Sequence, residues 1–137
     1  HVLQRRRVPS FDFVRQTKCD ALAIGIGNNH GKPRPDEYLH LDRLEEIRRI
    51  VSVPLVLHGA SGTPEGDIKK AIKLGITKIN IDTDLRLAFA GAERDVLKKT
   101  DIYDPREILQ PATDAMRDVV KHKIHLFGSA MKAKEIL

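Results

Sequence analysis

Three short apolar runs, each followed by a polar loop and an amphipathic helix, constrain the fold of this chain more than any other feature. The runs begin near Ala21, Val53 and Ile76. Apolar residues then recur at helical spacing over residues 41–51, 64–74 and 84–99. This alternation and its spacing are typical of βα units that form a parallel sheet. The chain is therefore predicted to have an α/β fold.

The stretch at residues 54–62 is the most informative of the three units. Its residues 55–57 suit a strand that is buried on both faces. Gly59 and Gly62 allow the backbone to turn sharply and to approach a ligand closely. Thr63 is predicted to cap the helix that follows.

The remaining segments are less regular, and each carries an expectation of its own. In the first part of the chain we expect a tail at 1–8, a helix from Pro9 to about Lys18 with Phe11, Val14 and Phe13 on its apolar face, a buried strand at 21–27, and irregular structure at 32–37. In the last part we expect a turn at 103–106, a helix at 108–121, an apolar piece at 124–127, and a brief terminal helix after Ser129. Polar and glycine residues gather after the strands, at the end that carries the site in parallel α/β proteins.

The composition excludes several classes of protein. The 137 residues suffice for one modest domain, and 41% hydrophobic residues allow a packed core. No apolar run approaches the roughly 20 residues that span a bilayer, so we expect no membrane partner. The net charge of +5 comes with only 4% aromatic residues, too few for stacking on bases, so we expect no nucleic-acid partner. Cys19 is the sole cysteine, which favours a reducing, cytoplasmic location.

Two histidines follow neighbouring predicted strands. Because adjacent strands lie about 4.8 Å apart, the imidazoles of His30 and His58 are within reach of one ion. Zinc binds imidazole nitrogen well, and a catalytic zinc site usually has three protein ligands. The alternative is a pair of unrelated loop histidines that hydrogen-bond to the backbone, and the residues alone leave both interpretations open.

Two loops offer donors for an anion. The first comprises Gly59, Ala60 and Ser61, and the second comprises Asn80, Ile81, Asp82 and Thr83. Ordinary helix capping by Thr63 and Asp84 is the competing explanation. Asp82 and Asp84 are the carboxylates of these loops, and each is either a general base or a cap or ion-pair partner of Lys78 or Arg86.

At these loops the sequence resembles the class II, zinc-dependent fructose- and tagatose-bisphosphate aldolases. The matching residues are Asp20-Ala21-Leu22-Ala23 with Gly27, His30-Gly31, the stretch 54–62, the stretch 75–83, Asp104-Pro105-Arg106 and Phe127-Gly128-Ser129-Ala130. The combination of His-Gly-Ala-Ser-Gly with Lys-Ile-Asn-Ile-Asp-Thr at this distance is specific. The match runs from about residue 9 to the end.

The resemblance implies a (β/α)8 TIM barrel of which residues 9–137 hold the last three βα units. It implies that His30 and His58 are two of three zinc ligands, and that a monovalent cation, Na⁺ or K⁺, binds nearby. It implies that a phosphorylated sugar contacts Gly31, Gly59, Ala60, Ser61, Asn80, Ile81, Asp82 and Thr83. The implied reaction is cleavage of a ketose 1,6-bisphosphate to dihydroxyacetone phosphate and glyceraldehyde 3-phosphate, in a homo-oligomer.

The sequence departs from the family pattern in what it lacks. The family's acid/base aspartate, the zinc histidine that follows it and a later glutamate have no counterpart in these 137 residues. Because the chain begins with His1, we expect a piece of a longer enzyme, with no catalytic acid/base of its own and no turnover alone. Two alternatives stay open: another phosphosugar-binding barrel, such as an isomerase, and an incomplete half-barrel that binds a phosphorylated ligand or a partner chain.

Overall fold

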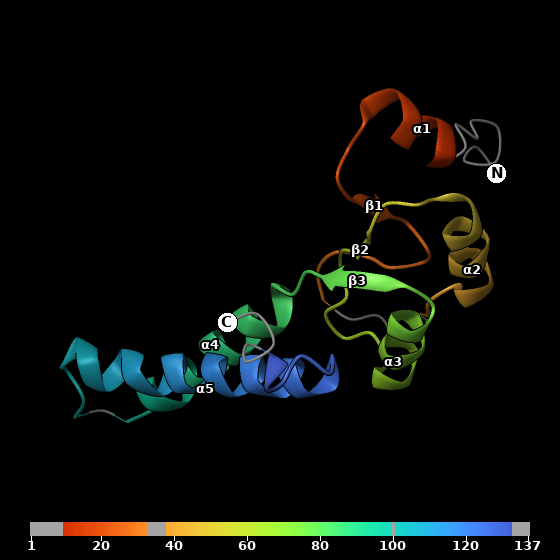
Figure 1. The fold of residues 1–137 in the computed structure, drawn as a ribbon. Coiled ribbons are helices and arrows are strands. Elements are labelled where there is room, and N and C mark those ends of the chain that lie inside the picture. Colours follow the sequence, from red (N-terminus) through yellow and green to blue (C-terminus); the bar gives the residue numbers. More distant parts are fainter. Residues whose placement is uncertain (1–9, 33–37, 100, 133–137) are drawn as a thin grey trace. The chain divides into compact units, whose positions relative to one another are not determined.

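The computed structural model describes residues 10–32, 38–99 and 101–132, which form two compact units, His1–Asn80 and Ile81–Leu137 (Figure 1). The expected tail at 1–8, nearly all of the irregular segment at 32–37 and most of any helix after Ser129 lie outside the described residues. Each unit is described by itself below.

The first unit contains a three-stranded parallel sheet. Its elements in chain order are α1 (Ser10–Thr17), β1 (Leu22–Ile24), α2 (Leu41–Ile50), β2 (Leu55–Leu57), α3 (Glu65–Lys73) and β3 (Ile76–Ile79). The strand order is β1-β2-β3, and both pairings are parallel. The predicted βα units and parallel sheet are confirmed.

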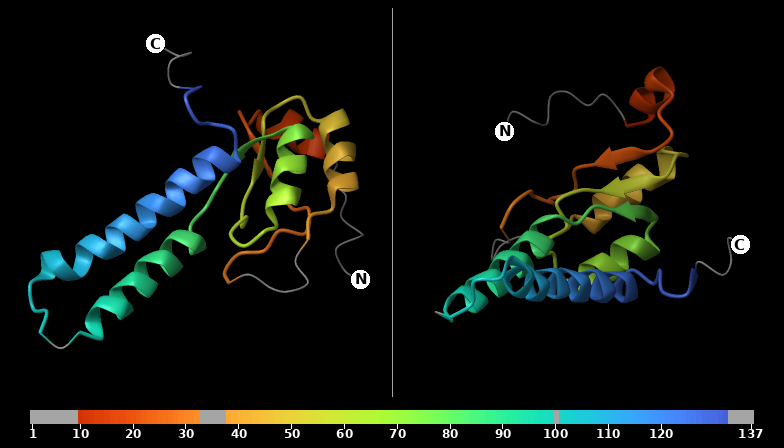
Figure 2. Two further views of the ribbon diagram at one scale, coloured as in Figure 1. Left: turned by 90° about the horizontal axis from the view of Figure 1, so that it is seen from below. Right: turned by 90° about the vertical axis from the view of Figure 1, so that its left-hand side faces the viewer.

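The core of this unit lies between the sheet and the helices that connect its strands. All of β2 is buried, as predicted, because it is the central strand. Leu44 and Ile47 of α2 and Ile68 and Ala71 of α3 are also buried. These two helices lie on the same side of the sheet (Figure 2). The apolar stripes therefore fix which face of the sheet is covered.

The buried strand expected at 21–27 is only partly confirmed, because β1 is shorter and its side chains are buried on one face only. Ile24 and Ile26 are buried, whereas Ala21, Ala23 and Gly25 are exposed. This alternation arises because successive side chains of a strand point to opposite faces of the sheet, and only one face of β1 is covered among the described residues. Of the apolar face expected on α1, Phe11 and Phe13 are exposed, at 52% and 45%, whereas Val14 is half-buried.

The start of α3 also differs from the prediction. Pro64 is the N-cap residue and no side chain caps the helix, so the assignment of Thr63 as N-cap is wrong. Thr63 lies one position earlier, is 6% exposed, and its Oγ1 has no hydrogen-bond partner among the described residues. At the other end, Gly75 follows the helix with φ +109°, the conformation expected of a glycine that ends a helix.

The second unit is a helical hairpin of α4 (Thr83–Leu97) and α5 (Pro105–Leu126). The side chains of Lys123 and Asp84 join the two helices with an ion pair of 2.6 Å. The segment 103–106, expected as a turn, includes the start of α5, because Asp104 is the N-cap and accepts a hydrogen bond from the Arg106 backbone N–H. The apolar piece expected at 124–127 continues α5 rather than forming a separate element.

No helix in the described ranges is long and apolar enough to cross a membrane.

Candidate functional site

The carboxyl ends of the three strands bring together the residues that the sequence singled out in the first unit. His58 follows β2 directly and Asn80 follows β3 directly. The Asn80 backbone N–H donates to the Leu57 carbonyl at 3.0 Å, which holds these two strand ends side by side. His30 comes from the loop after β1.

His30 and His58 are neighbours. Their ring centroids are 5.9 Å apart and the rings are inclined by 55°. Gly59 makes this possible: its φ is +59°, and a Cβ at this position would lie 2.2 Å from the Asn29 carbonyl oxygen. Only glycine allows the loop after β1 to approach the end of β2 so closely.

The pair fits part of a zinc site. Two imidazoles on one tetrahedral zinc, with Zn–N bonds of about 2.0 Å, have ring centres roughly 5–6 Å apart, in agreement with the observed spacing. The described residues contain no group of three or more His, Cys, Asp or Glu side chains placed to hold a metal ion. This part of the chain thus offers two ligands of the three that a catalytic zinc usually has.

Asn28 connects the ends of β1 and β2 through two hydrogen bonds. The sequence analysis assigned no role to this residue. Its Oδ1 accepts a hydrogen bond from the Ile26 backbone N–H, and its Nδ2 donates to the His58 carbonyl, both at 2.8 Å. The first contact is with a backbone N–H two residues before Asn28, which is the reverse of an Asx turn, in which the donor lies two residues after the asparagine. The second contact joins segments thirty residues apart, which no local pattern reveals.

A polar chain links Lys78, Asn80 and His58. The Lys78 Nζ donates to the Asn80 Oδ1 at 2.7 Å. The Asn80 Nδ2 lies 3.4 Å from each nitrogen of the His58 ring. Because the ammonium group occupies the amide oxygen, the Asn80 side chain presents its N–H donors on the side of His58.

The loop after His58 has small residues at the positions proposed for anion binding. Ala60 and Ser61 are buried, with 1% and 5% of their surface exposed, and Gly59 is half-buried. The first turn of α3 carries Glu65 and Asp67, which already complement the positive end of that helix. We therefore expect the backbone N–H groups of the loop, rather than those of the helix, to donate to an anion. Gly31, which lies in the loop after β1, is exposed and has a φ of +102°.

Ile81, Asp82 and Thr83 belong to the second unit, and their contribution to the site stays a prediction. Asp82 is the N-cap residue of α4, and its carboxylate pairs with the Arg86 guanidinium at 2.8 Å. Asp84 pairs with Lys123 in the same unit. Asp82 thus pairs with Arg86, one of the two partners that the sequence suggested, whereas Asp84 pairs with Lys123, which was not among them.

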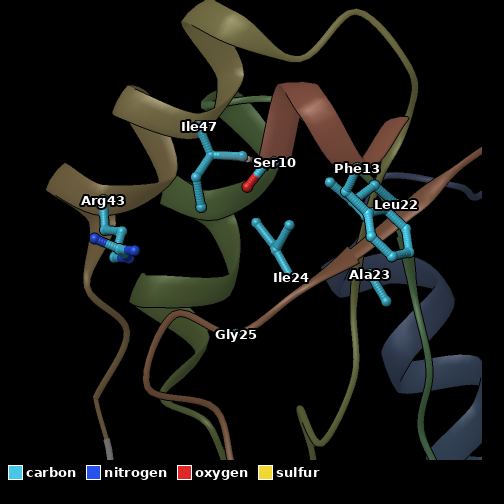
Figure 3. Close-up of a pocket in the computed structure, with 8 residues that line it drawn as sticks. All are labelled: Ser10, Phe13, Leu22, Ala23, Ile24, Gly25, Arg43 and Ile47. Atoms are coloured by element: carbon cyan, nitrogen blue, oxygen red, sulfur yellow. The ribbon is translucent and has the colours of Figure 1, made fainter. Parts of the chain in front are cut away.

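A separate cavity of about 300 Å³ lies between α1, β1 and α2 (Figure 3). Ile24 and Ile47 are in its lining, together with Arg43. Among the described residues that line it there is no histidine or carboxylate. This cavity lacks the groups for metal binding or acid–base chemistry.

The chain belongs to the class II fructose-bisphosphate aldolase family, whose model matches residues 9–132. The resemblance inferred from the loop motifs is therefore confirmed. The 6-phospho-5-dehydro-2-deoxy-D-gluconate aldolase of Bacillus licheniformis is 43% identical over 122 residues, which are 88% of this chain and 42% of that protein. The protein of the same name in Bacillus velezensis is 44% identical over 122 residues, with the same shares covered.

The solved structure of an aldolase is also similar to this chain. The YdjI aldolase from Escherichia coli K12 superposes with a TM-score of 0.79 and 40% sequence identity, over 90% of this chain and 44% of that chain. The chain thus spans less than half the length of the aldolases it matches.

Proposed function

We propose that this chain is the carboxyl-terminal part of a zinc-dependent class II aldolase with a complete (β/α)8 barrel. The enzyme cleaves a phosphorylated keto sugar and releases dihydroxyacetone phosphate. The observation that carries the proposal is the pairing of His30 with His58, at 5.9 Å between ring centroids, beside the small-residue loop at Gly59. Membership of the aldolase family supports the same reaction type.

His30 and His58 would hold the metal together with a third ligand from the rest of the enzyme. When bound, zinc acts as a Lewis acid that withdraws electron density from a ketone oxygen. Asn80 directs its side-chain N–H groups toward this region and would donate to an oxygen of the substrate. The backbone amides of Gly59, Ala60 and Ser61 would hold the phosphate, with Gly31 and the segment 81–83 completing its binding site. Backbone oxygens nearby would bind Na⁺ or K⁺.

The substrate class follows from a feature shared by the candidate substrates. Fructose and tagatose 1,6-bisphosphates carry a ketone next to a phosphorylated carbon. The relatives are named for 6-phospho-5-dehydro-2-deoxy-D-gluconate, in which a ketone at C5 also adjoins the phosphorylated C6. Cleavage of the bond between the carbons α and β to the ketone gives dihydroxyacetone phosphate in each case. We propose this common half as the part that the described site binds, and the deoxygluconate as a second candidate substrate beside the ketose bisphosphates.

The proton-transfer group would come from the rest of the enzyme. Cleavage requires a base that takes the proton of the hydroxyl group β to the ketone. Asp82 and Asp84, the carboxylates weighed for this role, are each engaged in an ion pair. An incomplete half-barrel that binds a phosphorylated ligand without catalysis is the competing proposal.

A replacement experiment tests the proposal. In the Bacillus licheniformis relative, the matched 122-residue segment is exchanged for the corresponding segment of this chain. We expect the hybrid to bind one zinc per chain and to release dihydroxyacetone phosphate from at least one of the three candidate substrates. Removal of zinc by a chelator should abolish the release, and added zinc should restore it.

His58→Ala in the hybrid is the decisive variant, and His125→Ala, on the exposed end of α5, is its matched control. The first should lose zinc and activity together, and the second should keep both. A folded hybrid with no cleavage of any candidate, or one whose activity survives chelation, would contradict the aldolase proposal. Phosphate binding without cleavage would favour the half-barrel instead.

A further inference from the structure

Lys78 lies on the face of the sheet that α2 and α3 do not cover. In the register of the sheet it is the partner of Val56, which is in turn the partner of Ala23. Because side chains alternate between the two faces of a strand, this row lies opposite Leu55 and Leu57, which are fully buried on the side of the helices (Figure 2). In the proposed complete barrel, the face that carries Lys78 lines the interior.

The ammonium group of Lys78 fixes the orientation of the Asn80 side-chain amide. Its Nζ donates to the Asn80 Oδ1 at 2.7 Å, which is at the short end of the range for such bonds. Hydrogen bonds from a charged donor are about twice as strong as those between neutral groups. An ammonium group can only donate, so it favours the amide oxygen as its neighbour over the amide nitrogen. The Nδ2 atom therefore lies on the other side of the amide, toward His58.

The Asn80 Nδ2 lies beside the His58 ring without a strong hydrogen bond to it. It is 3.4 Å from the Nδ1 atom and 3.4 Å from the Nε2 atom of the ring. These two ring nitrogens point in different directions, so a donor at equal distance from both is in line with neither. Both contacts are therefore weak, and the Nδ2 protons can be donated to an oxygen of a substrate beside the ring.

A metal ion at the two histidines would favour the reverse orientation of this amide. A carbonyl oxygen carries a negative partial charge and is a common ligand of cations, whereas an amide N–H is repelled by them. A zinc ion bound by His30 and His58 would therefore attract the Oδ1 of Asn80. The reversed amide would present an oxygen to the substrate oxygens and could not donate to them. The Lys78 ammonium opposes this reversal because it holds the same oxygen on the other side.

We propose that Lys78 is a positioning residue for the cleavage reaction. It holds the Asn80 oxygen away from the metal position and thereby keeps the Asn80 N–H groups directed at the substrate oxygen on which negative charge develops. A preorganised donor at such an oxygen lowers the reaction barrier without contributing to the binding of the phosphate. The catalytic part of this inference rests on the proposed function, whereas the orientation of the amide by Lys78 does not.

The hybrid enzyme described above tests the catalytic part. Lys78→Met removes the ammonium group and keeps a long side chain, and we expect kcat to fall roughly 10- to 100-fold with little change in KM or zinc content. Lys78→Arg should restore most of the kcat, because the guanidinium group also donates and cannot accept. Lys73→Met, which removes an exposed lysine from α3, should keep the full kcat. An active hybrid in which Lys78→Met keeps its kcat, or in which Lys78→Arg loses as much, would overturn the proposal.

The orientation of the amide is tested without activity, in the isolated 137-residue chain saturated with zinc. Nuclear Overhauser contacts between the Asn80 Nδ2 protons and the His58 ring protons should be present in the unchanged chain and in Lys78→Arg. They should weaken several-fold in Lys78→Met and disappear in Lys78→Glu, whose carboxylate accepts from Nδ2 and reverses the amide. Unchanged contacts in Lys78→Glu would overturn the proposal. A hybrid that cleaves none of the candidate substrates would contradict the aldolase proposal, and these contacts would still decide whether Lys78 orients Asn80.

Discussion

At the scale of single residues, the pairing of the two histidines depends on two other residues, Gly59 and Asn28, whose role in that pairing is structural. Gly59 lets the backbone at Asn29 approach the end of β2, and Asn28 ties the loop after β1 to the His58 carbonyl. These two residues bring His30 within 5.9 Å of His58, measured between ring centroids. Substitutions at either one should therefore affect metal binding without removing a ligand.

Gly59→Ala should separate the two histidines. Its Cβ would meet the Asn29 carbonyl oxygen at 2.2 Å, and because both groups belong to the backbone, the loop must move. We expect a loss of about 1–3 kcal/mol in the free energy of unfolding and at least tenfold weaker zinc binding. Denaturant unfolding and metal competition measure the two effects. Gly25→Ala is the control, since no atom lies within 4 Å of its added Cβ and its φ is not positive; equal behaviour of the two variants would refute the argument.

Asn28→Ala should destabilise the same region through lost hydrogen bonds. It leaves the Ile26 N–H and the His58 carbonyl without the 2.8 Å partners they now have. The expected cost is about 1–3 kcal/mol in the free energy of unfolding. Asn29→Ala is the matched comparison, because Asn29 is exposed and its contact with the Gly27 carbonyl is longer, at 3.4 Å. If Asn29→Ala costs as much, the brace assigned to Asn28 is wrong.

At the scale of the elements, the start of α5 predicts a pH dependence. The Asp104 carboxylate accepts hydrogen bonds from the Arg106 guanidinium and backbone N–H, which lower the pKa of Asp104 below its ordinary value of 3.8. A lowered folded-state pKa means that this stabilisation is fully present above pH 3.8 and is lost as the pH falls through the folded-state pKa.

Asp104→Ala should therefore lower the Tm at neutral pH by a few degrees, and the difference from the unchanged chain should vanish in strong acid. Asp104→Asn keeps an N-cap of similar quality and loses only the charge, so its Tm at neutral pH should lie between the other two. Thermal unfolding followed by circular dichroism from neutral to strongly acidic pH measures both effects. A deficit of Asp104→Ala that persists unchanged in acid would contradict the titration argument.

The hairpin predicts a contrast between two lysines on the same helix. Lys123 pairs with Asp84 of α4 at 2.6 Å, and both side chains are only 18% exposed. Lys121 lies 3.8 Å from Asp118 on its own helix, and both are well exposed. We expect Lys123→Met to cost about 1–3 kcal/mol in the free energy of unfolding, and Lys121→Met to cost less than about 0.5 kcal/mol. Denaturant titration of both variants compares them, and equal costs would exclude a stabilising role for the Asp84 pair.

The existence and type of the regular elements could be predicted from sequence, because apolar periodicity decides them. The helices around Leu44 and Ile68 and the buried strand at Leu55 follow from that pattern. The predictions fail where contacts with other parts of the chain determine the local structure. Whether β1 is covered on both faces depends on which elements pack against the sheet, and Thr63 turns into the core because Pro64 takes the cap position.

The candidate site could be predicted in its location but not in its detailed contacts. Polar residues after parallel strands meet at one edge, and this rule alone predicts that His30 and His58 are neighbours. The contact of Asn28 with the His58 carbonyl joins two strand ends, and the hydrogen bond from Lys78 to Asn80 depends on the side-chain conformations of two residues at the end of β3. No spacing in the sequence encodes them.

At the scale of the whole molecule, the chain spans 42% of the length of its Bacillus relatives. Its described residues supply two neighbouring imidazoles, which we propose as metal ligands, and no cluster of three potential ligands. Catalytic zinc sites need three protein ligands, and missing ligands reduce affinity steeply. The metal affinity of the isolated chain is therefore a direct measure of how complete its site is.

We expect the isolated 137-residue chain to bind one Zn²⁺ with a Kd on the order of micromolar. Zinc at about 100 times Kd should then stabilise the fold by about 2.7 kcal/mol, because only the folded chain pairs His30 with His58. Competition with a coloured chelator gives the affinity, and thermal unfolding with and without zinc gives the linkage. His30→Ala and His58→Ala should each remove both effects, whereas His125→Ala should remove neither. Nanomolar binding by the isolated chain would mean that a third ligand lies within these 137 residues, and the division of the metal site between this chain and the rest of the enzyme would be wrong.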